Sequence, residues 1–215
     1  MSRIWAIIPV KPLANAKSRL APALTPTERQ QLAEHMFRHV LKIATSVPQL
    51  AGTLVISRDN KALAIAREYG AKTVQESGAP EMNAALMRAT SLIARWRGSG
   101  VLILPADLPL IAVDDVVSMV ELGDDLYSMV IATDQDRDGT NAMLVRPPGL
   151  MEYGYGPGSF DRHIERAKAA GAHVQIYESE RLQLDIDLPE DLDVYTQWTN
   201  GASGNGAVRV RDEIL

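Results

Sequence analysis

The chain has 215 residues, of which 46% are hydrophobic and 23% charged, a balance that excludes disordered, fibrous and membrane-embedded classes. Its formal net charge of -5 excludes a general polyanion binder, because nucleic-acid binding relies on a basic face that releases counterions. The chain has no cysteine, which excludes disulfides, thiolate metal sites and cysteine nucleophiles. No window approaches the roughly twenty apolar residues of a membrane span. We therefore expect a cytoplasmic protein that has neither nucleic acid nor a membrane as a partner.

Strand and helix patterns alternate from the first residues onward. The apolar run at 4–8 predicts a central parallel strand covered on both faces. Thr25 and Pro26 supply an N-cap and a first-turn proline, and they begin an amphipathic helix that extends through Ile43. Further strands are predicted at 53–57, 71–74, 101–104, 128–132, 141–145 and 173–177. Further helices are predicted at 59–69, 81–97, 114–122, 161–170 and 189–198.

This alternation predicts an α/β protein with a doubly wound, mostly parallel sheet between helices, and a ligand beyond the carboxyl ends of the strands. Strand 141–145 is predicted to be an antiparallel neighbour of 128–132 or an edge strand. Residues 1–199 are expected to form a single domain. The glycine- and serine-containing segment 200–215 is expected to be a flexible C-terminal tail.

The loop after the first strand carries three cations: Lys11, Lys17 and Arg19. Lysine offers a mobile point charge and arginine a fork for two phosphate oxygens, so together they could neutralise a nucleoside triphosphate and its departing pyrophosphate. The alternative is an ordinary solvated surface loop. The position at the carboxyl end of a strand favours the functional interpretation. The chain has neither a Walker A sequence nor a dinucleotide-type glycine fingerprint.

Three aspartates stand at the ends of extended segments. Asp107 follows the strand at 101–104 between two prolines, and it is a candidate single anchor for Mg²⁺. Asp185 and Asp187 are two residues apart on an extended segment, so they point to one face and are candidates to complete that site. Turn stabilisation is the alternative for Asp107. Asp187 could also cap the helix that begins at Pro189.

Two glycine-containing loops, 136–142 and 155–160, predict a cradle for a small anion. Their glycines let backbone N–H groups approach a ligand, and their small polar side chains offer donors for phosphate or carboxylate oxygens. The candidate residues are Gly139, Thr140, Asn141, Gly156, Gly158 and Ser159. Two tight turns built from turn-type residues are the alternative.

The histidines suggest no catalytic set. His35 and His39 have a spacing that could bind zinc but lack a third ligand, so a solvated or partly buried pair is favoured. His163 lies just past the second cradle loop and is assigned at most a supporting role. No Ser/His/Asp set or catalytic lysine of the Schiff-base kind is evident.

Several of these segments together resemble the CofC/FbiD family. They are IPVKP (8–12), AKSRL (16–20), LPADLP (104–109), RDGTNA (137–142), YGPGSF (155–160) and DIDLPEDL (185–192). The resemblance runs in unbroken order from residue 4 to about 198. The family consists of guanylyltransferases of coenzyme F-420 biosynthesis with a fold similar to the nucleotide-diphosphosugar transferases, which agrees with the predicted α/β alternation.

The resemblance implies a reaction that joins GMP from GTP to a three-carbon phosphorylated acid, phosphoenolpyruvate or 2-phospho-L-lactate. It implies that Thr140, Gly156 and Ser159 bind the acid and that Asp107, Asp185 and Asp187 hold Mg²⁺. It also places Asn83 at the nucleotide. With these assignments, Lys11, Lys17, Arg19 and Asp107 are the expected catalytic residues, and the three cations also bind the nucleotide.

The nucleophile of such a reaction is an ionised phosphate oxygen, so no general base is needed and the work lies in alignment and charge neutralisation. We expect phosphoenolpyruvate as the acid, with 2-phospho-L-lactate or 3-phosphoglycerate as alternatives. A molybdenum-cofactor-type nucleotidyltransferase and a catalytically silent nucleotide-binding regulatory domain are further alternatives. For guanine recognition, the segment 76–83 and the Glu76 carboxylate are the candidates, because they follow a predicted strand.

Overall fold

The structure, a computed structural model, describes residues 3–77 and 81–201. Its strands are β1 (Ile4–Val10), β2 (Leu50–Ser57), β3 (Lys72–Gln75), β4 (Gly100–Ile103), β5 (Ser128–Thr133), β6 (Thr140–Arg146) and β7 (His173–Ile176). Its α-helices are α1 (Pro26–Ser46), α2 (Asn60–Glu68), α3 (Met82–Arg95), α4 (Val113–Leu122), α5 (Ser159–Ala169), α6 (Glu180–Gln183) and α7 (Pro189–Gly201). Two 3₁₀ turns, η1 (Leu13–Asn15) and η2 (Ser18–Leu20), follow β1.

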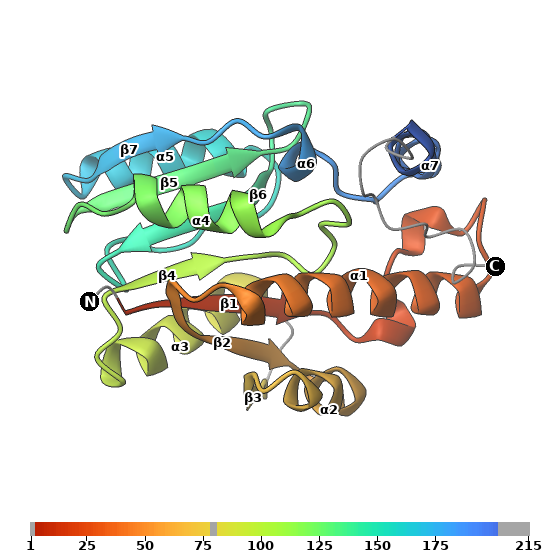
Figure 1. Ribbon diagram of the computed structural model, residues 1–215, viewed down its shortest axis with the longest axis horizontal. Coiled ribbons are helices and arrows are strands. Elements are labelled where there is room, and N and C mark those ends of the chain that lie inside the picture. Colours follow the sequence, from red (N-terminus) through yellow and green to blue (C-terminus); the bar gives the residue numbers. More distant parts are fainter. Residues whose placement is uncertain (1–2, 78–80, 202–215) are drawn as a thin grey trace.

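The strands form one seven-stranded sheet in the order β3-β2-β1-β4-β6-β5-β7 (Figure 1). β1 pairs in parallel with both β2 and β4, which confirms the predicted central parallel strand. β6 is antiparallel to both β4 and β5. It is therefore the predicted antiparallel neighbour of β5, and the alternative of an edge strand is wrong, because another strand pairs with it on each side.

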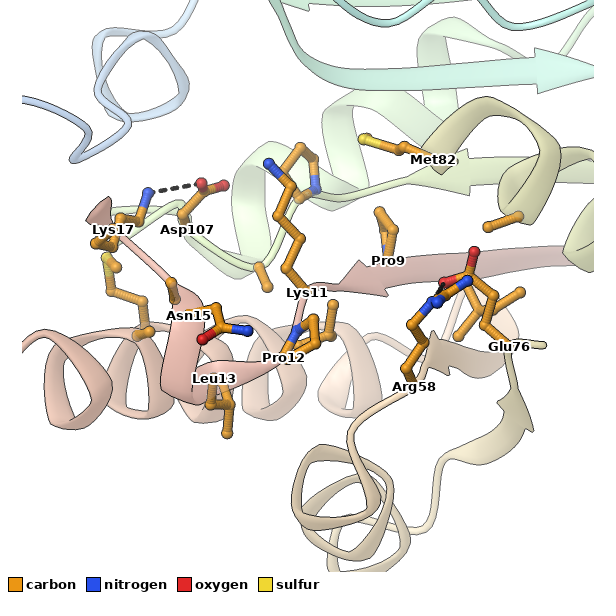
Figure 2. Close-up of a pocket in the computed structure, with 18 of the residues that line it drawn as sticks. Pro9, Lys11, Pro12, Leu13, Asn15, Lys17, Arg58, Glu76, Met82 and Asp107 are labelled. Carbon is orange, nitrogen blue, oxygen red and sulfur yellow. Dashed lines mark hydrogen bonds and ion pairs between the residues drawn. The ribbon is translucent and has the colours of Figure 1, made fainter. Parts of the chain in front are cut away.

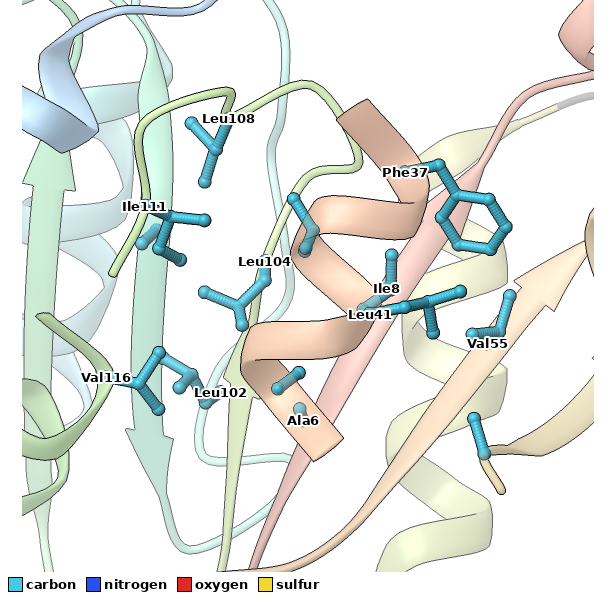
Figure 3. Close-up of a cluster of buried hydrophobic side chains, with 14 of the residues drawn as sticks. Ala6, Ile8, Phe37, Leu41, Val55, Leu102, Leu104, Leu108, Ile111 and Val116 are labelled. Carbon is cyan, nitrogen blue, oxygen red and sulfur yellow. The ribbon is translucent and has the colours of Figure 1, made fainter. Parts of the chain in front are cut away.

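Helices cover both faces of the sheet, as the doubly wound fold requires. One core cluster packs α1, α2 and α4 against one face, and Figure 3 shows Phe37 and Leu41 of α1 over Ile8, Val55 and Leu102 of the strands. The other cluster packs α3 and α5 against the opposite face. The predicted α/β class with a mostly parallel sheet is confirmed.

Local signals explain where the helices begin. Thr25 accepts the Glu28 N–H at 3.3 Å while the Glu28 carboxylate accepts the Thr25 N–H at 2.7 Å, so α1 begins with a reciprocal capping box. Asp191 accepts the N–H groups of Asp187 and Leu188, at 2.8 and 2.6 Å, and this stabilises the start of α7. Asp191 therefore caps α7, so the predicted alternative of a cap from Asp187 is not needed and the Asp187 carboxylate is available for other contacts.

The last helix continues beyond the predicted domain end. α7 reaches Gly201, so residues 200 and 201 of the expected tail are helical. The remainder of that prediction, 202–215, lies outside the described residues. Among the described residues, none of the helices combines the length and apolar character that a bilayer-spanning helix needs.

Candidate active site

A cleft of about 590 Å³ opens beyond the carboxyl ends of β1, β2 and β4 (Figure 2). Lys11 and Lys17 come to it from the loop after β1, and Asp107 comes from the loop after β4. Asp187 reaches it from the segment before α7. Four of the residues predicted from the sequence therefore line one cavity, at the edge of the sheet where ligands of open α/β folds bind.

Lys17 joins two of the predicted carboxylates. Its ammonium lies 2.7 Å from Asp107 Oδ2 and 2.9 Å from Asp187 Oδ1, and only 6% of its side chain is exposed. Arg19 lies 3.6 Å from the other oxygen of Asp187 but is largely exposed. Lys17 has the left-handed backbone conformation, with a φ of 55°, which a non-glycine residue seldom adopts. The backbone turn aims its side chain at the cleft.

A small hydrophobic cluster explains why segments 170 residues apart meet. Leu20 of η2 is fully buried against Leu184 and Ile186, beside Leu32 and Met36 of α1. Because side chains alternate along an extended segment, burial of Leu184 and Ile186 turns Asp185 and Asp187 the other way. Packing of apolar neighbours thus delivers the two carboxylates to the cationic loop.

The charges in this cluster shift one another's titration. Burial lowers the pKa of Lys17, but the Asp107 and Asp187 carboxylates outweigh it, so the pKa is raised. Burial and repulsion from Asp107 and Asp187 raise the pKa of Asp185 to about 6. Burial would raise the pKa of Asp187, yet Lys17, Arg19 and Lys11 lower it overall. Positive charge near these carboxylates is therefore stabilising.

Asn141 fixes the segment that carries Asp185. The β5–β6 register shifts between Ala132 and Thr133, so Asn141 is an extra residue on β6. Its amide donates to the carbonyl of Leu182 at 2.9 Å and approaches Asp185 Oδ1 at 3.4 Å. Asn141, a predicted member of the anion cradle, is thus directed instead toward the segment that carries Asp185.

Thr140 and Ser159 lie together, as predicted, but as a buried pair. Ser159 donates to Thr140 Oγ1 at 3.2 Å, and His163 Nδ1 lies 2.9 Å from the same oxygen. His163 Nε2 accepts the Gly154 N–H at 2.9 Å, so a neutral ring carries its proton on Nδ1 and donates to Thr140. With two donors directed at Thr140, its own O–H is the part that can serve an anion.

His163 is a buried partner of Thr140, which agrees with the supporting position that the sequence allowed it. It is fully buried, and burial, followed by the charges of Arg166 and Arg162, lowers its pKa to about 4. The ring is therefore neutral at pH 7, which the hydrogen bond from Gly154 requires. No sequence signal beyond its position after the second cradle loop indicated this role.

The two cradle loops dock on each other. Asp138 accepts the Gly158 N–H with its carboxylate and the Phe160 N–H with its carbonyl, each at 3.0 Å. Gly156 and Gly158 have φ angles of 133° and 68°, which glycine adopts without strain, so the turn itself accounts for glycine at these two positions. Gly156 is exposed at the tip, whereas Ser159 is buried.

Asn83 also holds a cradle loop. Its Oδ1 accepts the Tyr155 N–H at 2.7 Å and its Nδ2 donates to the Tyr155 carbonyl at 3.3 Å. Both functional atoms of the side chain are thus engaged by the backbone that leads to Gly156. Asn83 is not among the residues that line the cleft, so the structure places it behind the second cradle loop.

The far end of the cleft contains groups that the sequence analysis did not combine. Arg58 follows β2 and Glu76 follows β3, and their side chains pair with Nε 3.5 Å from Oε2. Both line the cavity (Figure 2). The position of Glu76 after a strand made it a predicted site residue, whereas nothing in the sequence indicated Arg58, because only the β2–β3 register shows that the two residues are neighbours.

The donor set fits Mg²⁺ only as part of a site. Among the described residues, no three carboxylate, histidine or cysteine side chains are arranged to hold a metal by themselves. Mg²⁺ is usually held by one or two carboxylates together with waters and substrate phosphates. Asp107 and Asp187 already converge on one cation, the Lys17 ammonium, and Asp185 lies beside them. The chemistry of these oxygens suits the ion, whereas the predicted three-aspartate site is not preassembled.

The histidine pair on α1 follows the favoured interpretation. His39 is partly buried, and its Nε2 lies 2.8 Å from the carbonyl of Ile111. Burial is the main cause that lowers the pKa of His39. Both histidines are partly buried, and among the described residues neither belongs to a group that could hold a metal ion.

Comparison with known proteins agrees with this geometry. The chain matches the family described as guanylyl transferase CofC like over residues 4–204. It is 40% identical to a phosphoenolpyruvate guanylyltransferase of Rubrobacter xylanophilus, with 88% of this chain and 91% of that protein covered. It is 36% identical to a 2-phospho-L-lactate guanylyltransferase of Methanothermobacter thermautotrophicus, with 87% and 81% covered.

Solved structures show the same fold. A putative nucleotide-diphospho-sugar transferase from Desulfovibrio desulfuricans superposes with a TM-score of 0.75 at 14% identity, covering 96% of this chain and 90% of that one. A nucleotidyl transferase from Methanothermobacter superposes with a TM-score of 0.65 at 13% identity, covering 94% and 100%. The fold is thus that of the nucleotide-diphospho-sugar transferases, as predicted. Within it, the chain belongs to the CofC-like guanylyl transferase family, which confirms the resemblance found in the sequence.

Proposed function

We propose that the chain transfers GMP from GTP to phosphoenolpyruvate in the presence of Mg²⁺. The observation that carries the proposal is the convergence of Lys17 with Asp107 and Asp187 in the cleft of a CofC-like chain. The choice of acid is supported by the relative that shares 40% of its residues and is named for phosphoenolpyruvate. A phosphate oxygen of the acid attacks the α-phosphorus of GTP, the bond from that phosphorus to the bridging oxygen breaks, and pyrophosphate leaves. The product is enolpyruvyl-diphospho-5′-guanosine.

The side chains of the cleft supply alignment and charge. Lys11, Lys17 and Arg19 neutralise phosphate oxygens, which lets two anions approach each other. Asp107, Asp185 and Asp187 would hold Mg²⁺, which supplies charge neutralisation at the transferred and departing phosphates. The phosphate nucleophile is already ionised, so no side chain must remove a proton.

The cradle would hold the acid. The Thr140 hydroxyl has its acceptor sites filled by Ser159 and His163, so it can donate to an oxygen of phosphoenolpyruvate. Gly156 at the loop tip offers backbone at close range because no Cβ shields it. Asn83 contributes by fixing that loop rather than by touching the nucleotide.

The test is to incubate the purified protein with GTP, Mg²⁺ and one acid at a time: phosphoenolpyruvate, 2-phospho-L-lactate or 3-phosphoglycerate. Pyrophosphate release and the product mass are the readouts. We expect release with phosphoenolpyruvate and a product mass equal to GMP plus the acid less water. Faster pyrophosphate release with 2-phospho-L-lactate would show that this acid, and not phosphoenolpyruvate, is the substrate. The relative at 36% identity, which is named for 2-phospho-L-lactate, supports this second candidate. GTP that no acid consumes would contradict the transferase function.

A further inference from the structure

The two ends of the cleft differ in chemistry. Figure 2 shows Lys17 and Asp107 at one end and Arg58 and Glu76 at the other, with Pro9 between them. If the first end holds phosphates, as the proposed function on which this inference rests requires, the base of the nucleotide extends toward the second end. The question is then which base the second end fits.

Glu76 is held firmly at that end. Its N–H donates to the Ser57 carbonyl at 2.8 Å, which fixes the backbone as β3 ends. Its carboxylate lies 3.5 Å from Arg58 through Oε2 and 3.3 Å from Arg88 through Oε1. Only 12% of the side chain is exposed. A carboxylate has about four acceptor positions, so two such contacts leave it able to accept further hydrogen bonds.

We propose that Glu76 is a specificity-determining residue that accepts hydrogen bonds from N1–H and the 2-amino group of guanine. These two donors lie side by side on the guanine edge, and a carboxylate accepts both. Adenine places an acceptor at N1 and carries no 2-amino group, so it would set a lone pair against the carboxylate and leave it unpaired. The arginines stabilise the carboxylate in the position where it reads the base.

Apolar residues near this end provide a surface for the rings. Ile56, Met82 and Ala85 line the same cavity, from β2 and from α3. A purine packed against them would be removed from water. A hydrogen bond to a charged group is stronger in such a water-poor environment. Reading of the base would thus take place on an apolar support beside one fixed carboxylate.

The test combines a protein variant with base analogues. Binding of GTP, ITP and ATP to wild type and Glu76→Gln is measured by calorimetry without any acid, and turnover is measured in parallel. ITP differs from GTP only by the missing 2-amino group. In wild type, losing that hydrogen bond to a charged group should weaken ITP about tenfold to a hundredfold relative to GTP. In Glu76→Gln, the affinity for GTP should fall, and the ratio of the GTP affinity to the ITP affinity should decrease toward one.

Control variants separate reading from stability. Glu68→Gln, an exposed change on α2 that does not line the cleft, should keep the wild-type ratio. If Glu76→Gln does not fold, Glu76→Asp keeps the charge but withdraws it by one methylene, and it too should lose discrimination. A full GTP/ITP ratio in the Glu76 variants would overturn the proposal. So would its collapse in Glu81→Gln, a second glutamate that lines the cleft. If the protein binds GTP more tightly than ITP and ATP but transfers GMP to no acid, the proposed function is contradicted and the assignment of Glu76 stands.

Discussion

At the scale of single residues, we expect the largest loss of activity from substitutions of the carboxylates around Lys17. Asp107→Asn and Asp185→Asn keep the size of the side chains but remove the charge that would hold Mg²⁺ and orient Lys17. We expect each to lower kcat/KM by about a hundredfold or more, since loss of an outer partner of a metal site alone costs tenfold to a hundredfold. The measurement is pyrophosphate release across a Mg²⁺ titration.

Asp161→Asn, an exposed change in the first turn of α5, is the matched control and should remain active. Activity of Asp107→Asn within about threefold of wild type at saturating Mg²⁺ would contradict the metal assignment, because ligand loss should cost far more.

The hydroxyls of the cradle make a different prediction. Thr140→Val removes the O–H that we assign to the acid, and Ser159→Ala removes the donor that orients it. The KM for phosphoenolpyruvate should rise about tenfold to a hundredfold in Thr140→Val, the worth of a hydrogen bond to a charged group. Ser159→Ala should raise it less. The KM for GTP should stay near the wild-type value in both variants. A raised KM for GTP with an unchanged KM for phosphoenolpyruvate would contradict the assignment and would place the triphosphate in the cradle.

Residue types and spacing were enough to predict Lys11, Lys17, Asp107 and Asp187 as neighbours, because all stand at the carboxyl edge of the sheet. The partners of Thr140 could not be predicted. His163 reaches it through helix α5, and Asn141 turns away because of a bulge in β6. A bulge depends on how two strands pair, and no pattern within one strand reveals it.

At the scale of elements, the short helix α6 is positioned by a buried carboxylate on α4. Asp115 is fully buried and accepts two hydrogen bonds from Arg181, at 2.8 and 2.9 Å, and one from Ser179 at 2.8 Å. Burial would raise the pKa of Asp115, but these donors and the Ala112 N–H lower it overall. The segment that follows α6 carries Asp185, so this ion pair supports the site from a distance.

Asp115→Asn should therefore destabilise the protein by about 2 kcal/mol, because the buried carboxylate loses its charge-assisted hydrogen bonds, whereas the Arg181 side chain is 40% exposed and is partly solvated. It should also lower kcat through displacement of α6. Urea unfolding monitored by circular dichroism measures the first effect. Asp114→Asn, one residue away and exposed, should change stability by less than about 0.5 kcal/mol. Equal stability of the two variants would contradict the supporting role of Asp115.

Most elements could be predicted because long apolar runs and cap residues mark them. Thr25 and Pro26 located the start of α1 to the residue, although the helix continues past the predicted Ile43 to Ser46. α6 was missed, since four residues without a periodic stripe give no signal, and it forms only because Asp115 and Asn141 bind it. The order of the strands in the sheet could not be predicted either. The position of β6 between β4 and β5 depends on contacts between segments that are far apart in the sequence.

At the scale of the whole molecule, protonation of His163 makes the free energy of unfolding depend on pH. Its pKa falls from an ordinary 6.5 to about 4, so the folded state favours the neutral ring. The resulting stability is complete above pH 6.5 and is lost as the pH falls toward 4. Its size is about 3 kcal/mol, from roughly 1.4 kcal/mol for each pKa unit.

His163→Gln should be less stable than wild type at pH 7, and the difference in unfolding free energy should shrink by about 3 kcal/mol by pH 4. Urea titrations at pH 7, 5.5 and 4 measure this. His173→Gln, on the exposed edge strand β7, should follow the wild-type pH dependence. A constant difference between wild type and His163→Gln at all three pH values would show that the ring is not kept neutral by folding.

The left-handed backbone of Lys17 has a consequence for engineering. This conformation costs an L-residue about 1 kcal/mol or more that glycine avoids, so Lys17→Gly should be more stable than Lys17→Ala. In the wild type this cost is opposed by the ion pairs of the Lys17 ammonium with Asp107 and Asp187. The chain has kept a residue that its own turn disfavours, and the ion pairs that its side chain makes are what an engineer would have to replace before exploiting glycine at this position.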